Sequence, residues 1–263
     1  MHNTQLDIIT FSPTGGSACI ANEVARGMEV SNIKTWNITK EIPTEQVCMG
    51  QGPVIVSAPV YGGRIPGIAL ERLQKFNGER TPAIVLVTYG NRDYEDALKE
   101  LCDVLTQQGF VPLAAGAFIA EHSYSTQEMP IAQGRPDEAD KETARRFGAQ
   151  VITTWRKKEE AKYNLSEIQV KGSFPYKVKG AHTPQAPSID QERCTLCGAC
   201  LDVCPTHAIS LIDDQTIFSD QALCIKCCAC VKSCPEEARS FETPFRKYLF
   251  ENFAVRKEPE FFL

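Results

Sequence analysis

The sequence lacks any long apolar run. Across its 263 residues, no uninterrupted apolar stretch reaches the roughly 20 residues that a transmembrane helix requires. Basic charge is not in excess either, because 28 Lys and Arg face 33 Asp and Glu, for a net charge of -5. Broad nucleic-acid binding needs a basic face that neutralises phosphates, so that class is disfavoured. The N-terminus runs from Met1 into the strand-like segment 6–11 without the basic region and cleavage site of an export signal. We therefore expect a cytoplasmic protein with no membrane insertion and no nucleic-acid partner.

Cysteine is scarce in most of the chain and dense in one segment. Three of the 12 Cys, namely Cys19, Cys48 and Cys102, stand singly in the first 193 residues, and the other nine lie between Cys194 and Cys234. In a secreted chain this density would indicate disulfides. In the reducing cytosol, thiolate ligation of metal is the better interpretation.

The first 158 residues alternate between strand-like and helical patterns. This alternation is typical of βαβ units and a parallel sheet. We expect a short helix in the crossover 39–50 and place Pro136 in the first turn of the last helix. The sequence predicts strands at 5–11, 33–38, 53–58, 82–89 and 111–120, and helices at 16–28, 67–76, 93–108 and 136–158. Five strands so connected predict an α/β, doubly wound parallel sheet that binds ligands outside the carboxyl ends of its strands.

The rest of the chain divides into three parts. Residues 159–187 are predicted to be a connector, and residues 188–243 contain an internal repeat. Residues 244–263 form a tail whose aromatic residues are spaced so that it could pack back onto another surface. In the repeat, each Cys of the first half recurs 30 residues later, and each fourth Cys is followed by Pro. The repeated residues are Cys194, Cys197, Cys200 and Cys204, then Cys224, Cys227, Cys230 and Cys234.

Both halves fit the pattern C-x2-C-x2-C-x3-C-P, in which the fourth Cys ligates the other of two iron-sulfur clusters. Zinc also takes paired cysteines, but it requires neither a third Cys in each run nor a Pro after each fourth one. Cys228 is left over, and we interpret it as a structural or reactive free thiol. The pattern predicts one [4Fe-4S] cluster on Cys194, Cys197, Cys200 and Cys234, and a second on Cys224, Cys227, Cys230 and Cys204.

This segment of about 55 residues resembles the bacterial-type 2[4Fe-4S] ferredoxins, with all eight ligands in place. The resemblance implies a small α+β dicluster domain. Residues 186–243 carry nine acidic and four basic residues, so partners that dock there should present basic surfaces.

A hydroxyl-rich turn follows the first strand. Ser12, Pro13, Thr14, Gly15, Gly16 and Ser17 lead into a helix, and such a turn gathers N–H and hydroxyl donors around a phosphate. No Lys follows, which disfavours a Walker A loop, and the spacing is not G-x-G-x-x-G. The turn is similar to the S-x-T-G-x-T phosphate loop of flavodoxins, which implies FMN. Gly16 stands where Asn is common, and Ser17 replaces the last Thr.

Two further loops follow the third and fourth strands. They resemble the two loops of flavodoxins that hold the flavin ring, although any single tyrosine in them could instead pack in the core. The resemblance implies Pro59, Val60, Tyr61, Gly62 and Gly63 on one side of the ring, and Tyr89, Gly90, Asn91 and Tyr94 on the other. After the fifth strand, His122 or Tyr124 could approach the flavin or be simply solvated.

Taken together, the chain resembles fused flavodoxin-ferredoxin proteins of anaerobes. This implies a flavodoxin-like sheet of order 2-1-3-4-5, two [4Fe-4S] clusters, FMN and electron transfer to redox protein partners. The alternative is an FMN-dependent reductase of a small substrate that the clusters supply with electrons. No nicotinamide-binding domain is recognisable, which favours protein donors.

Overall fold

A six-stranded sheet forms the centre of the larger domain. The computed structural model describes residues 5–50, 52–160, 168–181, 183–213 and 215–263. Five strands are parallel, and the sixth, from the C-terminal tail, lies antiparallel at one edge. The order across the sheet is β12 (Glu260–Phe262), β7 (Phe110–Ile119), β6 (Thr81–Tyr89), β4 (Val54–Pro59), β1 (Gln5–Thr10) and β2 (Asn32–Asn37). Without β12 this is the order 2-1-3-4-5, which confirms the predicted flavodoxin-like fold.

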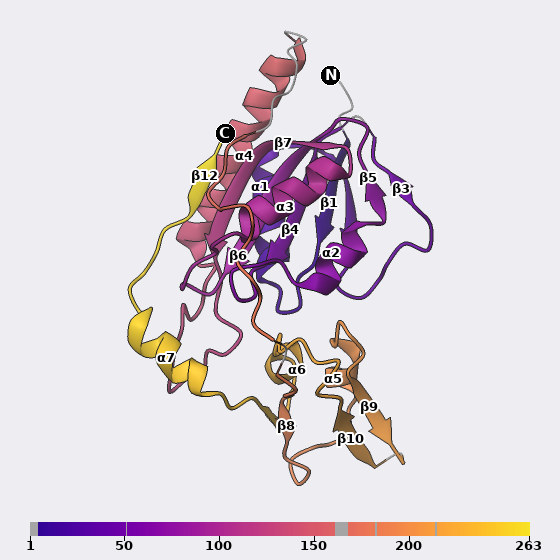
Figure 1. Cartoon of the computed structure of the whole chain (residues 1–263), viewed down its shortest axis with the longest axis vertical. Coiled ribbons are helices and arrows are strands. Elements are labelled where there is room, and N and C mark those ends of the chain that lie inside the picture. The colour runs from indigo at the N-terminus through magenta and orange to yellow at the C-terminus, as the bar shows by residue number, and fades with distance from the viewer. Residues whose placement is uncertain (1–4, 51, 161–167, 182, 214) are drawn as a thin grey trace.

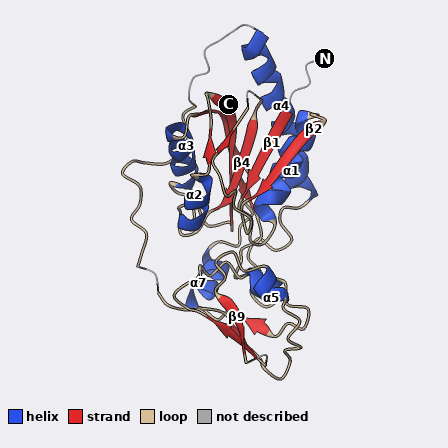
Figure 2. Ribbon diagram, turned by 90° about the vertical axis from the view of Figure 1, so that its right-hand side faces the viewer, coloured by secondary structure: helices blue, strands red, loops and turns tan. Residues whose placement is uncertain are grey.

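Helices cover both faces of the sheet (Figure 2). One apolar cluster contains α1 (Gly16–Met28) and α4 (Glu138–Glu160), and the other contains α2 (Gly67–Leu73) and α3 (Ala97–Gln107). Every residue of β6 is buried because both faces of this central strand are covered. The contact between α1 and α4 depends on Gly27, since a Cβ there would lie 1.9 Å from the Arg145 carbonyl oxygen.

Three local predictions were wrong. No helix forms in 39–50, where β3 (Val47–Cys48) instead pairs with β5 (Phe76–Asn77). Helix α3 begins four residues later than predicted, because Glu95 has a φ of 44° that no α-helix accommodates. Helix α4 begins after Pro136, not around it. The Asp137 and Asp140 carboxylates accept hydrogen bonds from each other's backbone N–H, which fixes the start of that helix.

The smaller domain repeats its own backbone at an offset of 30 residues. Helices α5 (Ala199–Asp202) and α6 (Ala229–Lys232) are related in this way. Strand β8 (Ser188–Ile189) pairs with β11 (Arg239–Ser240) as β10 (Thr216–Ser219) pairs with β9 (Ile209–Ile212). Left-handed backbone recurs as well, at Leu196 and Lys226, Gly198 and Cys228, and His207 and Glu237. Each half therefore folds in the same way, and Cys228 replaces a glycine at a left-handed position.

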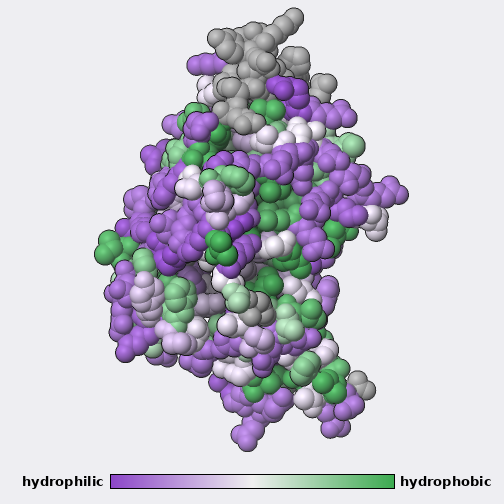
Figure 3. All heavy atoms as spheres, in the orientation of Figure 1, coloured by the Kyte–Doolittle hydropathy of each residue, from purple (hydrophilic) through white to green (hydrophobic). Residues whose placement is uncertain are grey.

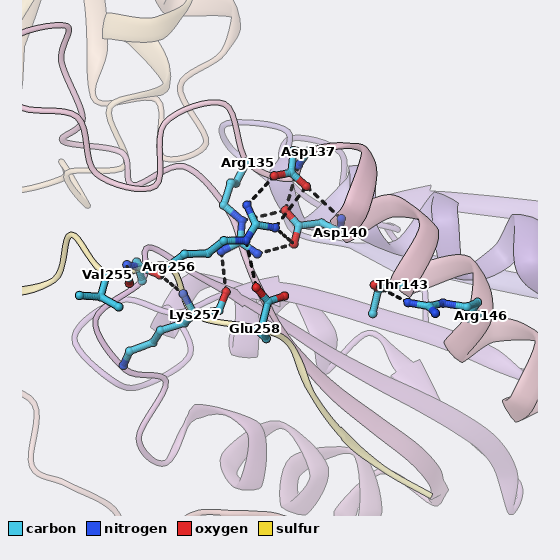
Figure 4. Close-up of polar contacts among 10 residues, drawn as sticks. Arg135, Asp137, Asp140, Thr143, Arg146, Val255, Arg256, Lys257 and Glu258 are labelled. Carbon is cyan, nitrogen blue, oxygen red and sulfur yellow. Dashed lines mark hydrogen bonds and ion pairs between the residues drawn. The ribbon is translucent and has the colours of Figure 1, made fainter.

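The tail returns from the smaller domain to the larger one (Figure 1). Helix α7 (Pro244–Asn252) begins at the Thr243 hydroxyl, which accepts from the Phe245 N–H. Farther on, Arg256 pairs with Asp137 at 2.6 Å, and Arg135 donates to the Lys257 carbonyl at 2.7 Å (Figure 4). The ring of Phe261 stacks on Phe147 at 4.9 Å, so β12 is held by the aromatic core as well as by the sheet. The aromatic pattern of the tail thus corresponds to an added edge strand.

Part of the predicted connector, residues 161–167, lies outside the described residues. Residues 168–181 run along α3, where the Asp96 carboxylate accepts from the N–H of Ser173 at 2.8 Å and of Lys177 at 2.6 Å. Tyr176 donates to Asp103 at 2.6 Å. This segment is therefore packed onto the larger domain. In the described part of the chain, no helix combines the length and apolarity needed to cross a bilayer.

Candidate functional site

A cavity opens at the carboxyl ends of the central strands. Four loops of the larger domain line it, together with three residues from the C-terminal part of the chain. The lining residues are Ser12, Pro13, Thr14, Gly16 and Ser17; Pro59, Val60, Tyr61 and Gly62; Thr88, Tyr89 and Gly90; Ala120, Glu121, His122, Ser123 and Tyr124; and Ile225, Lys226 and Phe245.

The turn after β1 ends at the N-terminus of α1, which forms part of the cavity wall. Ser12 Oγ accepts from the Ala18 N–H at 3.0 Å, and Ser17 shares a 2.6 Å hydrogen bond with the buried Thr88 hydroxyl. These two hydroxyls therefore fix the turn to the helix and to β6. Gly16 is required because a Cβ would lie 2.9 Å from that of Ala120. A helix N-terminus attracts anions, as the sequence predicts for this turn.

Aromatic side chains line the opposite walls. Burial raises the pKa of Tyr89 to about 12, and burial together with the neighbouring Cys227 and Cys228 thiols raises the pKa of Tyr61. Gly90 is needed beside them, since a Cβ there would lie 2.3 Å from the His122 ring. Both tyrosines therefore carry neutral phenol groups at neutral pH. Tyr89 also belongs to the apolar core, where its ring centroid lies 5.5 Å from that of Tyr94.

His122, one of the two loop candidates, lines the cavity as a neutral imidazole. Burial, with the nearby charges of Arg92 and Lys232, lowers its pKa to about 4. Its Nδ1 accepts from the Tyr124 N–H at 3.0 Å, and the two rings lie 4.8 Å apart. The other candidate, Tyr124, thus reaches the same wall.

Four predicted residues do not line this cavity. Gly15 lines an adjoining hollow beside Cys19, and Gly63 packs against Glu95. The Asn91 amide donates to the Phe253 carbonyl at 2.6 Å and the Val255 carbonyl at 2.8 Å. The Tyr94 hydroxyl donates to Glu260 at 2.6 Å. The prediction placed Asn91 and Tyr94 at a ligand, whereas both anchor the C-terminal tail.

The cysteines surround two other cavities. Each is lined by three thiols from one half of the repeat and a fourth from the other half, and Cys228 also lines the second cavity. This crossing of the chain places together the residues that the repeat assigns to each set. The first cavity has Cys194, Cys197, Cys200 and Cys234, and the second has Cys204, Cys224, Cys227 and Cys230.

Backbone donors reach the sulfur atoms in a pattern that also repeats. The Ala208 N–H donates to Cys204 Sγ at 3.2 Å, and the Ala238 N–H donates to Cys234 Sγ at 3.3 Å. Burial raises the pKa of Cys227 to about 12. Cys227 is thus buried, and Cys204 and Cys234 are supplied with backbone donors, as is typical of sulfur ligands to iron. Among the described residues, no three metal-binding side chains gather tightly enough for a single ion.

One residue joins the two kinds of cavity. Ile225, between the second-half cysteines, lines both the second thiol cavity and the cavity of the larger domain. Lys226 and Phe245 join it in the latter. The prediction missed these three residues because nothing in their local pattern shows which surface they meet.

Polar contacts hold the two domains at this junction. Lys232 Nζ lies 2.8 Å from Glu121 and donates to the Ser125 carbonyl at 3.0 Å. Arg246 donates to the Tyr124 carbonyl at 2.9 Å. Buried Arg72 in α2 donates to the Pro205 carbonyl at 2.5 Å. The two cavities therefore share a wall within a bonded interface.

Comparison with known proteins identifies part of this arrangement. A family model described as a 4Fe-4S binding domain matches residues 187–210. No curated protein sequence matches the chain.

Several solved structures are similar to the larger domain. A flavodoxin from the domain Archaea is 10% identical, with 58% of this chain and 99% of that chain covered and a TM-score of 0.39. A Streptococcus pneumonia flavodoxin is 14% identical, with 57% and 98% covered and a TM-score of 0.38. Rubredoxin oxygen:oxidoreductase from Desulfovibrio gigas is 14% identical, with 60% and 37% covered and a TM-score of 0.40.

TM-scores of this size carry no argument alone, so the fold assignment rests on the strand order. The smaller domain is assigned by its match to the 4Fe-4S family model and by its cysteine pattern. The chain thus joins an α/β domain of flavodoxin-like topology to a 4Fe-4S ferredoxin-like domain.

Proposed function

We propose that this protein transfers electrons between two [4Fe-4S] clusters and FMN, and exchanges them with redox partner proteins. The observation that carries the proposal is the shared wall. Ile225 lines the second thiol cavity and also the cavity at the anion-binding end of α1. Two redox sites that adjoin across one side chain are suited to exchanging electrons with each other.

The donor sets fit the clusters. Cys194, Cys197, Cys200 and Cys234 would hold the first, and Cys204, Cys224, Cys227 and Cys230 the second. Apart from Arg239 and the sulfur atoms, each cavity is lined largely by apolar side chains, and backbone N–H groups donate to Cys204 and Cys234. The family match covers the first half of the repeat, and the backbone repeat supports extending the assignment to the second half.

The larger cavity fits a flavin phosphate and ring. Thr14 and Gly16, at the start of α1, would hold the phosphate. Tyr61 and Tyr89 would flank the ring, with the segment 59–62 and Gly90 supplying close backbone approach. When bound, the clusters supply one-electron transfer and the flavin exchanges one or two electrons.

The position of Ile225, Lys226 and Phe245 favours the relay over the reductase alternative. These residues bring the ferredoxin-like domain to the flavin cavity, whose walls they complete. Partners that dock on the acidic smaller domain should carry basic surfaces, and docking should weaken with salt. A thiol-rich centre of this kind is suited to a reducing compartment such as the cytoplasm.

The test is cofactor content in two matched variants of the anaerobically purified chain. Wild type should contain about eight irons and one FMN. Thr14→Glu should lose FMN and keep iron, because a carboxylate repels the phosphate, whereas Thr14→Ser should keep both. Zinc in place of iron would contradict the ferredoxin assignment. Turnover of a small acceptor by the purified protein without any partner would favour the reductase.

A further inference from the structure

Arg239 is a buried arginine between the two thiol cavities. Its side chain is 4% exposed, and it lines both cavities. Nη2 donates to Ser219 Oγ at 2.7 Å and to the Pro187 carbonyl at 3.4 Å, and it approaches Cys230 Sγ at 3.8 Å. Nε and Nη1 are buried without a hydrogen-bond partner among the described residues.

The position breaks the internal repeat. The equivalent residue 30 positions earlier is Ile209, which is also buried and lines only the second cavity. An apolar residue is therefore compatible with this backbone. The second half instead places a charged side chain in the core of the smaller domain.

Nothing in the described protein neutralises this charge. No carboxylate forms an ion pair with Arg239 among the described residues, and its other contacts are a hydroxyl, a carbonyl and a sulfur. An arginine remains charged at any physiological pH. Burying such a charge costs several kcal/mol unless an opposite charge lies close by. Two buried N–H groups without partners add to that cost.

The surroundings of Arg239 supply the missing charge only when the thiols are ligands. Arg239 lines the cavity that contains Cys200 and also the cavity that contains Cys224 and Cys230, and its Nη2 lies 3.8 Å from Cys230 Sγ. Cys200 belongs to the first set, and the other two belong to the second. The guanidinium thus acts on both sets at once.

We infer that Arg239 is the shared counter-cation of both clusters and raises the reduction potential of each. The inference rests on the proposed function. Two anionic clusters would neutralise the guanidinium, because Arg239 lines both of the cavities that would hold them. Because reduction makes a cluster more negative, a fixed cation nearby favours the reduced form.

The test is an anaerobic redox titration of the whole chain, followed by electron paramagnetic resonance, after iron content has been measured. Arg239→Met should keep the iron of wild type and shift the midpoint potentials of both clusters to more negative values. Arg239→Gln, which is neutral but can donate a hydrogen bond, should give a smaller shift in the same direction. Arg193→Met is the matched control, because Arg193 is exposed and lies in the same domain. It should leave both potentials unchanged.

The outcomes separate this inference from the proposed function. A wild-type chain without iron would contradict the proposed function itself. Unchanged potentials in an iron-loaded Arg239→Met variant would overturn the inference alone. A shift confined to one cluster would refute the shared role. Iron loss from both Arg239 variants would also overturn it, by showing that the residue serves to assemble the domain.

Discussion

The two halves of the cysteine repeat have the same backbone pattern but different surroundings. In the first half, Cys197 and Leu196 are exposed, and no residue of the first thiol cavity lines the cavity of the larger domain. In the second half, Cys227 is buried, and Ile225 lines both the second thiol cavity and the cavity of the larger domain. Identical ligand chemistry is therefore differentiated by what packs around it. The second half is built to face the flavodoxin-like domain, and the first to face outward.

Exposed apolar residues gather at the outward end of the smaller domain, over β9 and β10 (Figure 3). They include Leu211, Ile212 and Phe218. This placement favours docking of a redox partner protein at the first half of the repeat. Four predictions sharpen or break the contrast between the halves.

The largest effect should come from removing one ligand in each half. Cys197→Ser and Cys227→Ser should each lose about four irons. Only Cys227→Ser should also slow reduction of the flavin, because only the second cavity adjoins it. Iron analysis and the rate at which a chemical reductant bleaches flavin absorption provide the measurement. Equal slowing in both variants would remove the distinction between the halves.

Substitutions at the equivalent left-handed positions of the two halves should have a smaller effect. Gly198 has a φ of 79° and Cys228 a φ of 55°. Gly198→Ala should destabilise the domain by about 1–2 kcal/mol, because a Cβ there has space but the backbone is strained. Cys228→Gly relieves similar strain but loses a buried thiol, so it should change stability less. The thermal midpoint of cluster bleaching measures both, and a larger loss in Cys228→Gly would show that the thiol has a role beyond packing.

The pH dependence of the free energy of unfolding tests the burial of His122 in the cavity that the second half adjoins. Because the pKa of His122 is lowered to about 4, the unfolded chain binds a proton there that the folded chain does not. The contribution of neutral His122 to the stability of the fold is fully present above the unfolded pKa of about 6.5 and is lost as the pH falls toward 4. Between about pH 7 and pH 5.5 the free energy of unfolding should fall by about 1 kcal/mol.

Chemical denaturation at the two pH values checks this, with His122→Gln as the control. The glutamine variant should lose less stability over the same interval. An identical loss in both proteins would assign the effect to other groups.

The smallest effect should come from the ion pair at the domain junction. Lys232 and Glu121 are partly exposed, so Lys232→Met should cost no more than about 1 kcal/mol. It should also raise the pKa of His122, because the Lys232 charge is one cause of its lowering. Among the described residues, Asp202, at the equivalent position of the first half, forms no hydrogen bond or ion pair with the larger domain, and Asp202→Asn serves as the control. Titration of His122 by NMR would show no difference between the two variants if the charge of Lys232 did not reach the cavity.

The sequence predicted what depends on local pattern. The order of the strands was implied by the resemblance to flavodoxins. Alternating strands and helices predicted the parallel sheet, and the 30-residue offset predicted the two thiol sets that the fold brings together. Both signals follow directly from spacing, since a buried strand or a metal ligand must recur at fixed positions. The turn after β1 was found for the same reason, because its residues act within one helical turn.

Long-range partners account for what the prediction missed. Asn91 and Tyr94 fit a ring-binding loop by type, but they contact residues more than 160 positions away. Strand β12 has three residues, too few for an alternating pattern to be recognised. The roles of Ile225 and Arg239 depend on which cavities meet at them, and no local pattern contains that information.

Strand β12 also determines how the smaller domain is attached. Because the chain leaves the larger domain after the segment 168–181, which packs along α3, and returns to it at β12, the smaller domain is held at both ends. A domain on one flexible linker samples many orientations, and its effective concentration at a partner site falls as the linker lengthens. Attachment at two points removes much of that freedom. Under the proposed function, electron exchange between the two domains is therefore intramolecular, and its rate should not depend on protein concentration.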